Sequence, residues 1–183
     1  MTRDDASPPI VLAAGPWRIE FFQAGDRFRH RLCVGDQCIA ETIDDDGGDP
    51  AWPPSPPIQQ LSKEPIGSGE AILGVGGAGT GHWSLSVSQV MDAQQNSVAL
   101  NIEWACRTTE APQYLGTRYR ILVDHGDDRW VPQWPRAAGG TRVWSGTDEH
   151  GRNGEHGFEP ELQSQQPGQQ TVCWSYHFGD SPA

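Results

Sequence analysis

The late part of the chain, residues 125–156, carries the densest group of side chains that could do chemistry. Tryptophan rings lie there among carboxylates, imidazoles and an arginine. Aromatic rings can cover the apolar C–H faces of a sugar while carboxylates accept its hydroxyl protons, so this mixture is typical of a carbohydrate or other polar small-molecule site. With one tryptophan from an earlier loop, the predicted ligand-binding residues are Trp52, Trp130, Trp134, Trp144, Asp127 and Arg129.

The same segment leaves open an enzyme that acts on a sugar. Imidazoles and carboxylates are the usual general acids and bases, and the candidates here are His125, Asp128, Glu149 and His150. The spacing of His150 and His156 would admit a divalent metal but matches no standard zinc pattern, so we expect no metal and no cofactor. A third alternative is a protein-interaction domain that docks partners on exposed aromatic residues or on the proline-rich residues 53–57.

A pair of titratable groups occurs earlier in the chain. A two-residue turn at Gly35-Asp36 would place His30 opposite Glu41 among apolar neighbours. A buried imidazole beside a carboxylate is either a general base or a satisfied internal hydrogen bond, and we favour the structural role. The same register places Cys33 opposite Cys38, which is close enough for a disulfide or a contact with a soft metal.

The beginning of the chain bears on the state of these cysteines. It has acids where a signal peptide has positive charges, and its apolar stretch is limited to residues 10–14. We therefore predict a cytoplasmic location. In that compartment all four cysteines, at positions 33, 38, 106 and 173, are expected to be reduced.

Two further segments resemble ligand-binding motifs, but their surroundings in the sequence argue against a binding site. Residues 74–79 match G-x-G-x-x-G, but the alternating pattern of a strand follows them instead of the helix that a dinucleotide site needs, so we expect a flexible loop. The acidic residues 44–49 lack the ligand positions of an EF-hand, so we expect a solvated turn.

Strands must position all of these groups, because alternation of apolar and polar residues dominates the chain. Nine segments show it: residues 17–22, 28–34, 38–43, 58–62, 70–75, 82–90, 98–107, 117–124 and 171–178. The expected fold is an all-β antiparallel β-sandwich, with an up-and-down antiparallel β-barrel as the alternative. Residues 1–183 form one domain, with a flexible tail at 1–15 and a long polar loop at 125–170.

The first three strands form a predicted meander. A four-residue loop at 23–26 would place Glu20 opposite Arg29 and Phe21 opposite Phe28. Arg18, Arg29 and Arg31 then line the outer face, where they attract an anionic ligand or pair with the acidic residues 44–49.

This pattern of strands and loop tryptophans resembles sugar-binding sandwiches and galactose-mutarotase-like proteins. The resemblance implies either a binding module or a sugar-active enzyme.

Composition excludes several classes of protein. The 183 residues carry a net charge of −11, which repels the phosphate backbone of nucleic acids. Apolar runs are too short for a membrane span, and 22 glycines with 15 prolines leave little room for long helices. We expect a carbohydrate or polar small molecule as partner, and neither nucleic acid nor membrane; composition sets no oligomeric state.

Overall fold

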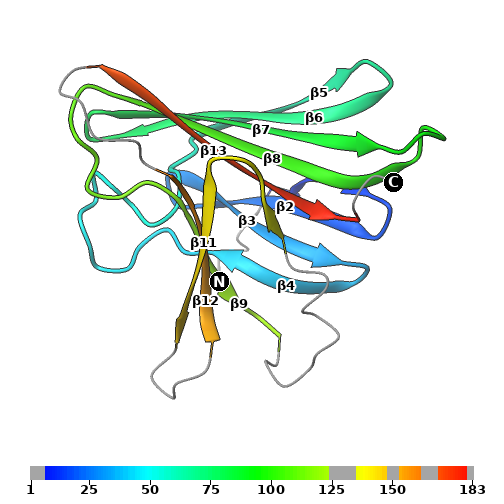
Figure 1. Ribbon diagram of the computed structural model, residues 1–183, viewed down its shortest axis with the longest axis horizontal. Coiled ribbons are helices and arrows are strands. Elements are labelled where there is room, and N and C mark those ends of the chain that lie inside the picture. The colour runs from blue at the N-terminus through cyan, green and yellow to red at the C-terminus, as the bar shows by residue number, and fades with distance from the viewer. Residues whose placement is uncertain (1–6, 124–134, 148–152, 162–168, 181–183) are drawn as a thin grey trace, which may run out of the picture.

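Apolar and polar side chains alternate along the strands, and the chain forms two antiparallel sheets that pack face to face as a β-sandwich (Figure 1). The computed structural model describes residues 7–123, 135–147, 153–161 and 169–180. The seven-stranded sheet has the order β1 (Ile10–Ala14), β2 (Trp17–Ala24), β3 (Arg27–Val34), β4 (Gln37–Thr42), β9 (Thr117–Ile121), β12 (Asn153–Pro160) and β11 (Thr141–Thr147). The six-stranded sheet has the order β10 (Arg136–Ala137), β13 (Gln170–Gly179), β8 (Ser97–Thr108), β7 (Gly81–Met91), β6 (Gly69–Ala78) and β5 (Gln60–Ile66).

The sandwich prediction is confirmed, and the barrel alternative is wrong because the two sheets are not closed on each other. The expected strand count is also wrong, since the described residues contain thirteen strands. All nine predicted segments contribute a strand, and β1, β10, β11 and β12 are additional. Part of the expected tail is therefore a strand that pairs with β2, and part of the expected 125–170 loop forms β10 to β12.

Glycine sets the turns of the first meander. Gly15, Gly25 and Gly35 each open a two-residue turn with a φ between +56° and +66°, and the residue that follows has no positive φ. This is the pattern of a type II′ turn, which suits the twist of a hairpin.

The β2–β3 hairpin therefore turns at Gly25-Asp26, two residues tighter than predicted. Glu20 lies opposite Arg31 and Phe21 opposite His30, so the predicted pairs with Arg29 and Phe28 are wrong. A two-residue offset leaves every side chain on its expected face, because the side-chain period of a strand is two.

A β-bulge changes the next hairpin. Cys33 faces Cys38 as predicted, but Leu32 pairs with Ala40, so Ile39 is the extra residue. Ile39 and Ala40 are both fully buried. Beyond the bulge the pairing shifts by one residue, Arg31 instead of His30 faces Glu41, and the predicted His30–Glu41 pair is wrong.

The buried space between the sheets is largely aromatic, and a chain of hydrogen bonds crosses it. His30 Nε2 lies 2.6 Å from the hydroxyl of Tyr119, which lies 2.6 Å from the hydroxyl of Tyr176. The indole N–H of Trp104 donates to the same Tyr176 oxygen at 3.1 Å. Tyr119 belongs to the seven-stranded sheet and Tyr176 to the other, so the polar atoms of the core link the two layers.

The proline-rich segment closes one end of the sandwich. Residues 52–58 are all buried, and Ile58 bridges to Phe28 of β3 while Gln59 N–H donates to Val75 O of β6. A buried segment is not available as a polyproline ligand. Gly76 lies under it, where a Cβ atom would fall 1.8 Å from the carbonyl oxygen of Pro57. Most of the glycine-rich run therefore belongs to strand β6, and the expected flexible loop is wrong.

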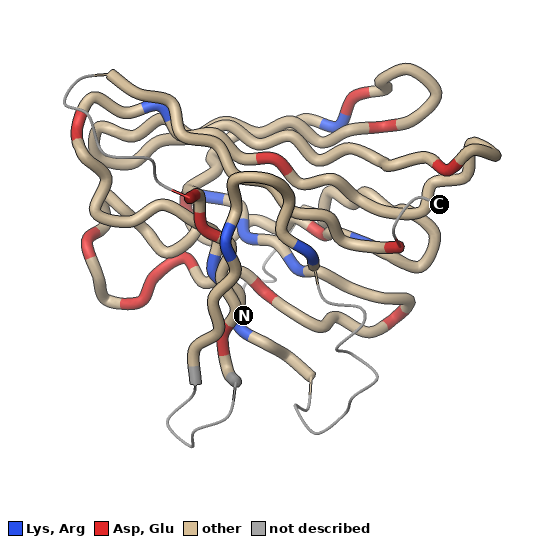
Figure 2. The backbone as a smooth tube through the Cα atoms, viewed as in Figure 1, with Lys and Arg blue, Asp and Glu red and all other residues tan. Residues whose placement is uncertain are grey.

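Arginine and glutamate side chains form ion pairs on the outer face of the seven-stranded sheet. Figure 2 shows the arginine positions in blue and the glutamate positions in red. Glu41 accepts from Arg29 and from Arg31, each at 2.6 Å, and Arg29 also approaches Asp44 at 3.6 Å. The predicted arginine row is thus engaged by carboxylates, including one from the acidic loop. Within the described residues there is no helix long and apolar enough to span a membrane.

Candidate functional site

Arg118 of β9 lies where carboxylates and an aromatic ring from other elements meet. A pocket of about 220 Å³ lies beside it, between the loop that follows β4 and the segment that precedes β9. We call it the Arg118 pocket; its lining residues are Asp46, Gly48, Asp49, Trp52, Pro54, Gln113, Tyr114 and Arg118. Larger depressions lie elsewhere. Two of about 310 and 410 Å³ lie on the outer face of the six-stranded sheet, and serine, alanine and glycine make up much of their linings. Another of about 640 Å³ is lined by polar residues that include His82 and Arg107, without an aromatic wall.

Local hydrogen bonds shape the acidic wall of the pocket. The Asp46 carboxylate accepts the N–H of Gly48, and the Asp49 carboxylate accepts the N–H of Ala51, so each aspartate folds its own turn. The following chain is held to β9, because the N–H of Arg118 donates both to the Pro54 carbonyl and to the Ser55 hydroxyl. The expected solvated turn is therefore one wall of a pocket.

The Arg118 guanidinium joins three elements of the fold. It pairs with the carboxylate of Asp46 and, at 2.6 Å, with that of Glu155 on β12. Its central carbon also lies 5.3 Å from the centre of the Trp144 ring on β11. Burial disfavours its charge, but the hydrogen bond and charge of Glu155 and the charge of Asp46 outweigh burial and raise the pKa of Arg118.

Several buried donors lie behind this wall. The Tyr114 hydroxyl and the Trp144 indole N–H are shielded from solvent and interact with each other without the geometry of a normal hydrogen bond, and Nε of Arg118 is buried without a hydrogen-bond partner among the described residues. Burial, followed by the charge of Glu159, raises the pKa of Tyr114 above its usual value, so this hydroxyl keeps its proton. Buried polar groups without a partner are uncommon in folded proteins, and the described residues hold others outside this site, such as Trp17 Nε1 and Ser97 Oγ.

The structure brings together two of the predicted ligand-binding residues. Trp52 lines the Arg118 pocket, and the Trp144 ring, which is not part of that lining, lies against the Arg118 guanidinium. Trp52 is only 7% exposed and packs edge-on against Trp83, so it serves as a wall and not as an open stacking platform.

The remaining predicted site residues lie outside the described residues. They are Asp127, Arg129, Trp130 and Trp134 from the binding set, and His125, Asp128, Glu149 and His150 from the catalytic set. Sequence reasoning missed Tyr114 and Arg118. Arg118 occupies an outward position in an alternating strand, and nothing local to it indicates that Asp46, 72 residues away, is its partner.

His30 lies in the core and away from the Arg118 pocket. Complete burial lowers the pKa of His30 to about 3, so the ring stays neutral and bonded to Tyr119. His30 therefore has the structural role that we favoured, an internal hydrogen bond, but its partner is Tyr119 instead of Glu41.

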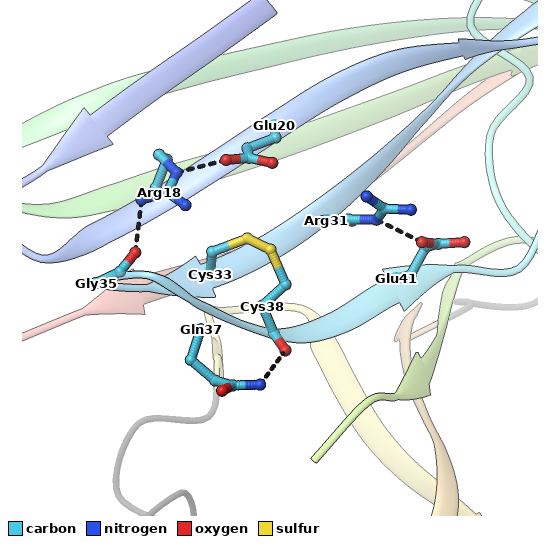
Figure 3. Close-up of a disulfide and its surroundings, with 8 residues drawn as sticks. All are labelled: Arg18, Glu20, Arg31, Cys33, Gly35, Gln37, Cys38 and Glu41. Carbon is cyan, nitrogen blue, oxygen red and sulfur yellow. Dashed lines mark hydrogen bonds and ion pairs between the residues drawn. A yellow bond between two sulfur atoms is a disulfide. The ribbon is translucent and has the colours of Figure 1, made fainter. Parts of the chain in front are cut away.

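The expectation that all four cysteines are reduced is wrong for one pair. Cys33 and Cys38 form a disulfide across the β3–β4 hairpin, with their Cα atoms 3.8 Å apart (Figure 3). Cys106 and Cys173 are free thiols, the first buried and the second exposed.

The fold and this pocket define the chain as a β-sandwich protein with a small polar pocket at one end of its core. Comparison with protein-family models, curated proteins and solved structures finds no match.

Proposed function

We propose that the protein is a binding module that holds a polar small molecule, of the size of one sugar ring or the terminal unit of a glycan, in the Arg118 pocket. The observation that carries this proposal is the lining itself. Carboxylates from Asp46 and Asp49, the amide of Gln113 and the guanidinium of Arg118 share one concave space with aromatic walls. A ligand with many hydroxyl groups needs acceptors and donors in this combination.

The size of the pocket restricts the ligand. Drug-sized molecules occupy sites of roughly 300–1,000 Å³, and this pocket of about 220 Å³ lies below that range. One ring fits, whereas a longer glycan would have to extend from the pocket into solvent.

The carboxylates of Asp46 and Asp49 have lone pairs that can accept further hydrogen bonds, so the Arg118 pocket favours a ligand with hydroxyl groups over an anion. An ionised carboxylate has about four lone-pair sites, and among the described residues the N–H of Ala51 uses one of those of Asp49. Asp46 and Asp49 would repel an anion, although Arg118 offsets part of that charge. We therefore propose a neutral saccharide as the ligand.

The test is a calorimetric titration of the full chain with neutral and acidic monosaccharides and short oligosaccharides. Asp49→Asn is expected to weaken binding about tenfold or more, because it removes a charge-assisted hydrogen bond worth about 1.5–3 kcal/mol. Arg118→Lys is expected to weaken binding as well, because lysine keeps the charge but lacks the planar fork of donors that pairs with Asp46 and Glu155. Arg120→Lys is the matched control, since Arg120 lies on the same strand and face but is not among the lining residues.

Two outcomes contradict the proposal. The first is the absence of saturable binding across the whole set of sugars. The second is equal weakening by Arg118→Lys and Arg120→Lys, because a site elsewhere on the molecule would not distinguish the two arginines.

The cytoplasmic location stays a prediction. Disulfides are rare in that compartment, so alkylation of free thiols in intact cells, followed by mass spectrometry of the peptide with Cys33 and Cys38, tests it directly. We expect both thiols to be alkylated if the prediction holds.

A further inference from the structure

Three metal-ligating side chains from three neighbouring strands meet on the outer face of the seven-stranded sheet. Glu20 of β2, Cys33 of β3 and Cys38 of β4 each offer a ligand atom, and these atoms all lie within 4.8 Å of one another (Figure 3). We propose that, once the disulfide is reduced, these residues form a binding site for a soft divalent cation of the zinc class. The site is separate from the Arg118 pocket, because Cys38 lies at the opposite end of β4 from the contact with Arg118.

The hairpin holds the ligands together without the disulfide. Cys33 and Cys38 are paired in the β3–β4 register directly beside the Gly35-Asp36 turn, with Cα atoms 3.8 Å apart. Glu20 comes from the next strand, where it lies opposite Arg31. Because backbone pairing fixes all three positions, breaking the S–S bond leaves the two sulfurs and the carboxylate near one another.

The donor set suits zinc. Two thiolates and one carboxylate are ordinary zinc ligands, and sites with three protein ligands leave a fourth position for water or another group. Cys33 is fully buried, whereas Cys38 and Glu20 are partly exposed. One ligand is thus shielded while the others leave an approach from solvent.

The redox state opens or closes the site. Only the thiolate binds a metal ion, and a disulfide sulfur is not a thiolate. Two equivalents of a small thiol reductant give both cysteine thiols and one molecule of the reductant's disulfide. Binding of the cation to both sulfurs then releases two protons.

Arg18 competes with the cation for Glu20. Its Nε donates to the Glu20 carboxylate at 2.6 Å, and its second contact is the carbonyl of Gly35 at 2.6 Å. The positive charge opposes a cation, so Arg18 must release the carboxylate when metal binds. Glu41 is not among the groups whose ligand atoms lie within 4.8 Å of the two sulfurs, and two arginines hold it instead of one.

The test is a titration of the reduced full chain with Cd²⁺ and with Zn²⁺, followed by calorimetry and, for Cd²⁺, by the ultraviolet charge-transfer absorption of cadmium thiolates. We expect one ion per chain, release of two protons, and no such binding by the oxidised protein. The double variant Cys33→Ser, Cys38→Ser loses the signal. Glu20→Gln weakens binding about tenfold or more, and Arg18→Gln strengthens it.

Cys173→Ser is the matched control, because Cys173 is an exposed free thiol on β13 that takes no part in the cluster. Circular dichroism of each reduced variant verifies that it is folded. The proposal is overturned if the reduced protein binds no more Cd²⁺ than the double serine variant, if Glu20→Gln leaves the affinity unchanged, or if Cys173→Ser removes the signal.

Discussion

His30 is the buried side chain whose protonation opposes folding most directly. Burial lowers its pKa to about 3, whereas an exposed histidine in the unfolded chain titrates near 6.5. Between these values the unfolded state binds more protons than the folded state, so stability is fully present above about pH 6.5 and is lost as the pH falls towards 3.

The His30→Gln variant therefore tests this linkage. The wild-type protein is expected to lose up to about 1.4 kcal/mol of unfolding free energy per pH unit below 6.5 from this one group. His30→Gln flattens that part of the dependence, as measured by urea unfolding between pH 7.5 and 4.5. His177→Gln removes an exposed imidazole and serves as the control; equal slopes in wild type and His30→Gln would refute the assignment.

For a single residue, the sequence indicates which face of the sheet its side chain occupies better than it indicates which residue that side chain contacts. Alternation places His30 inward, and it is buried. Its partner could not be predicted, because the bulge at Ile39 has no marker in residue type and shifts the pairing by one. The contact between Arg118 and Asp46 spans 72 residues, and a single sequence carries no signal for it.

At the scale of elements, the crossing of the proline-rich segment over β6 depends on Gly76. A Cβ atom at this position would meet the Pro57 carbonyl at 1.8 Å, and a backbone oxygen cannot move aside as a flexible side chain can. We expect Gly76→Ala to lower the free energy of unfolding by about 1–3 kcal/mol, the usual cost of overpacking.

The matched control for this substitution is Gly139→Ala. Gly139 has open space around the position of a Cβ and no positive φ, so the change is expected to stay within about 0.5 kcal/mol. Denaturant unfolding of the two variants measures both values. Equal stability of Gly76→Ala and Gly139→Ala would show that the proline-rich segment does not press on β6.

Strand positions were largely predictable because alternation is a local property. Loop lengths could not be predicted in the same way. Shortening the β2–β3 loop by two residues changes the register but leaves every apolar side chain on the same face. Strands β11 and β12 were missed because polar residues and glycines interrupt their pattern, although Phe158 of β12 is fully buried.

At the scale of the whole molecule, the Tyr119–Tyr176 contact ties one sheet to the other. Burial raises the pKa of Tyr119 well above its usual value and that of Tyr176 to about 12, so both hydroxyls keep their protons. Tyr119→Phe removes the hydrogen-bond partner of His30 Nε2 and one partner of the Tyr176 hydroxyl, which keeps the indole N–H of Trp104, and it is expected to cost about 1–3 kcal/mol.

A double-mutant cycle with Tyr176→Phe measures the coupling between the sheets. We expect a non-additive term of about 0.5–3 kcal/mol in the free energy of unfolding. Tyr176→Phe combined with Lys63→Ala is the control, because Lys63 lies on β5, four strands away, and the two effects should add. Additive effects of the two tyrosine substitutions would contradict the link.

The all-β class was predictable from the whole chain, because alternation, glycine and proline all point to short strands. The hydrogen bonds between the two sheets could not be predicted. They join tyrosine hydroxyls and a histidine that come together only in the folded protein.

The Arg118 pocket is the proposed binding place of a saccharide. The most direct measurement is a titration of the ¹⁵N-labelled protein with the sugars that bind, in which the indole N–H signals of the tryptophans are followed by NMR. We predict that the signals of Trp52 and Trp144 shift in a saturable way while those of the core residues Trp104 and Trp174 stay in place. Shifts of Trp104 and Trp174 without shifts of Trp52 and Trp144 would place the ligand on the six-stranded sheet and contradict the account.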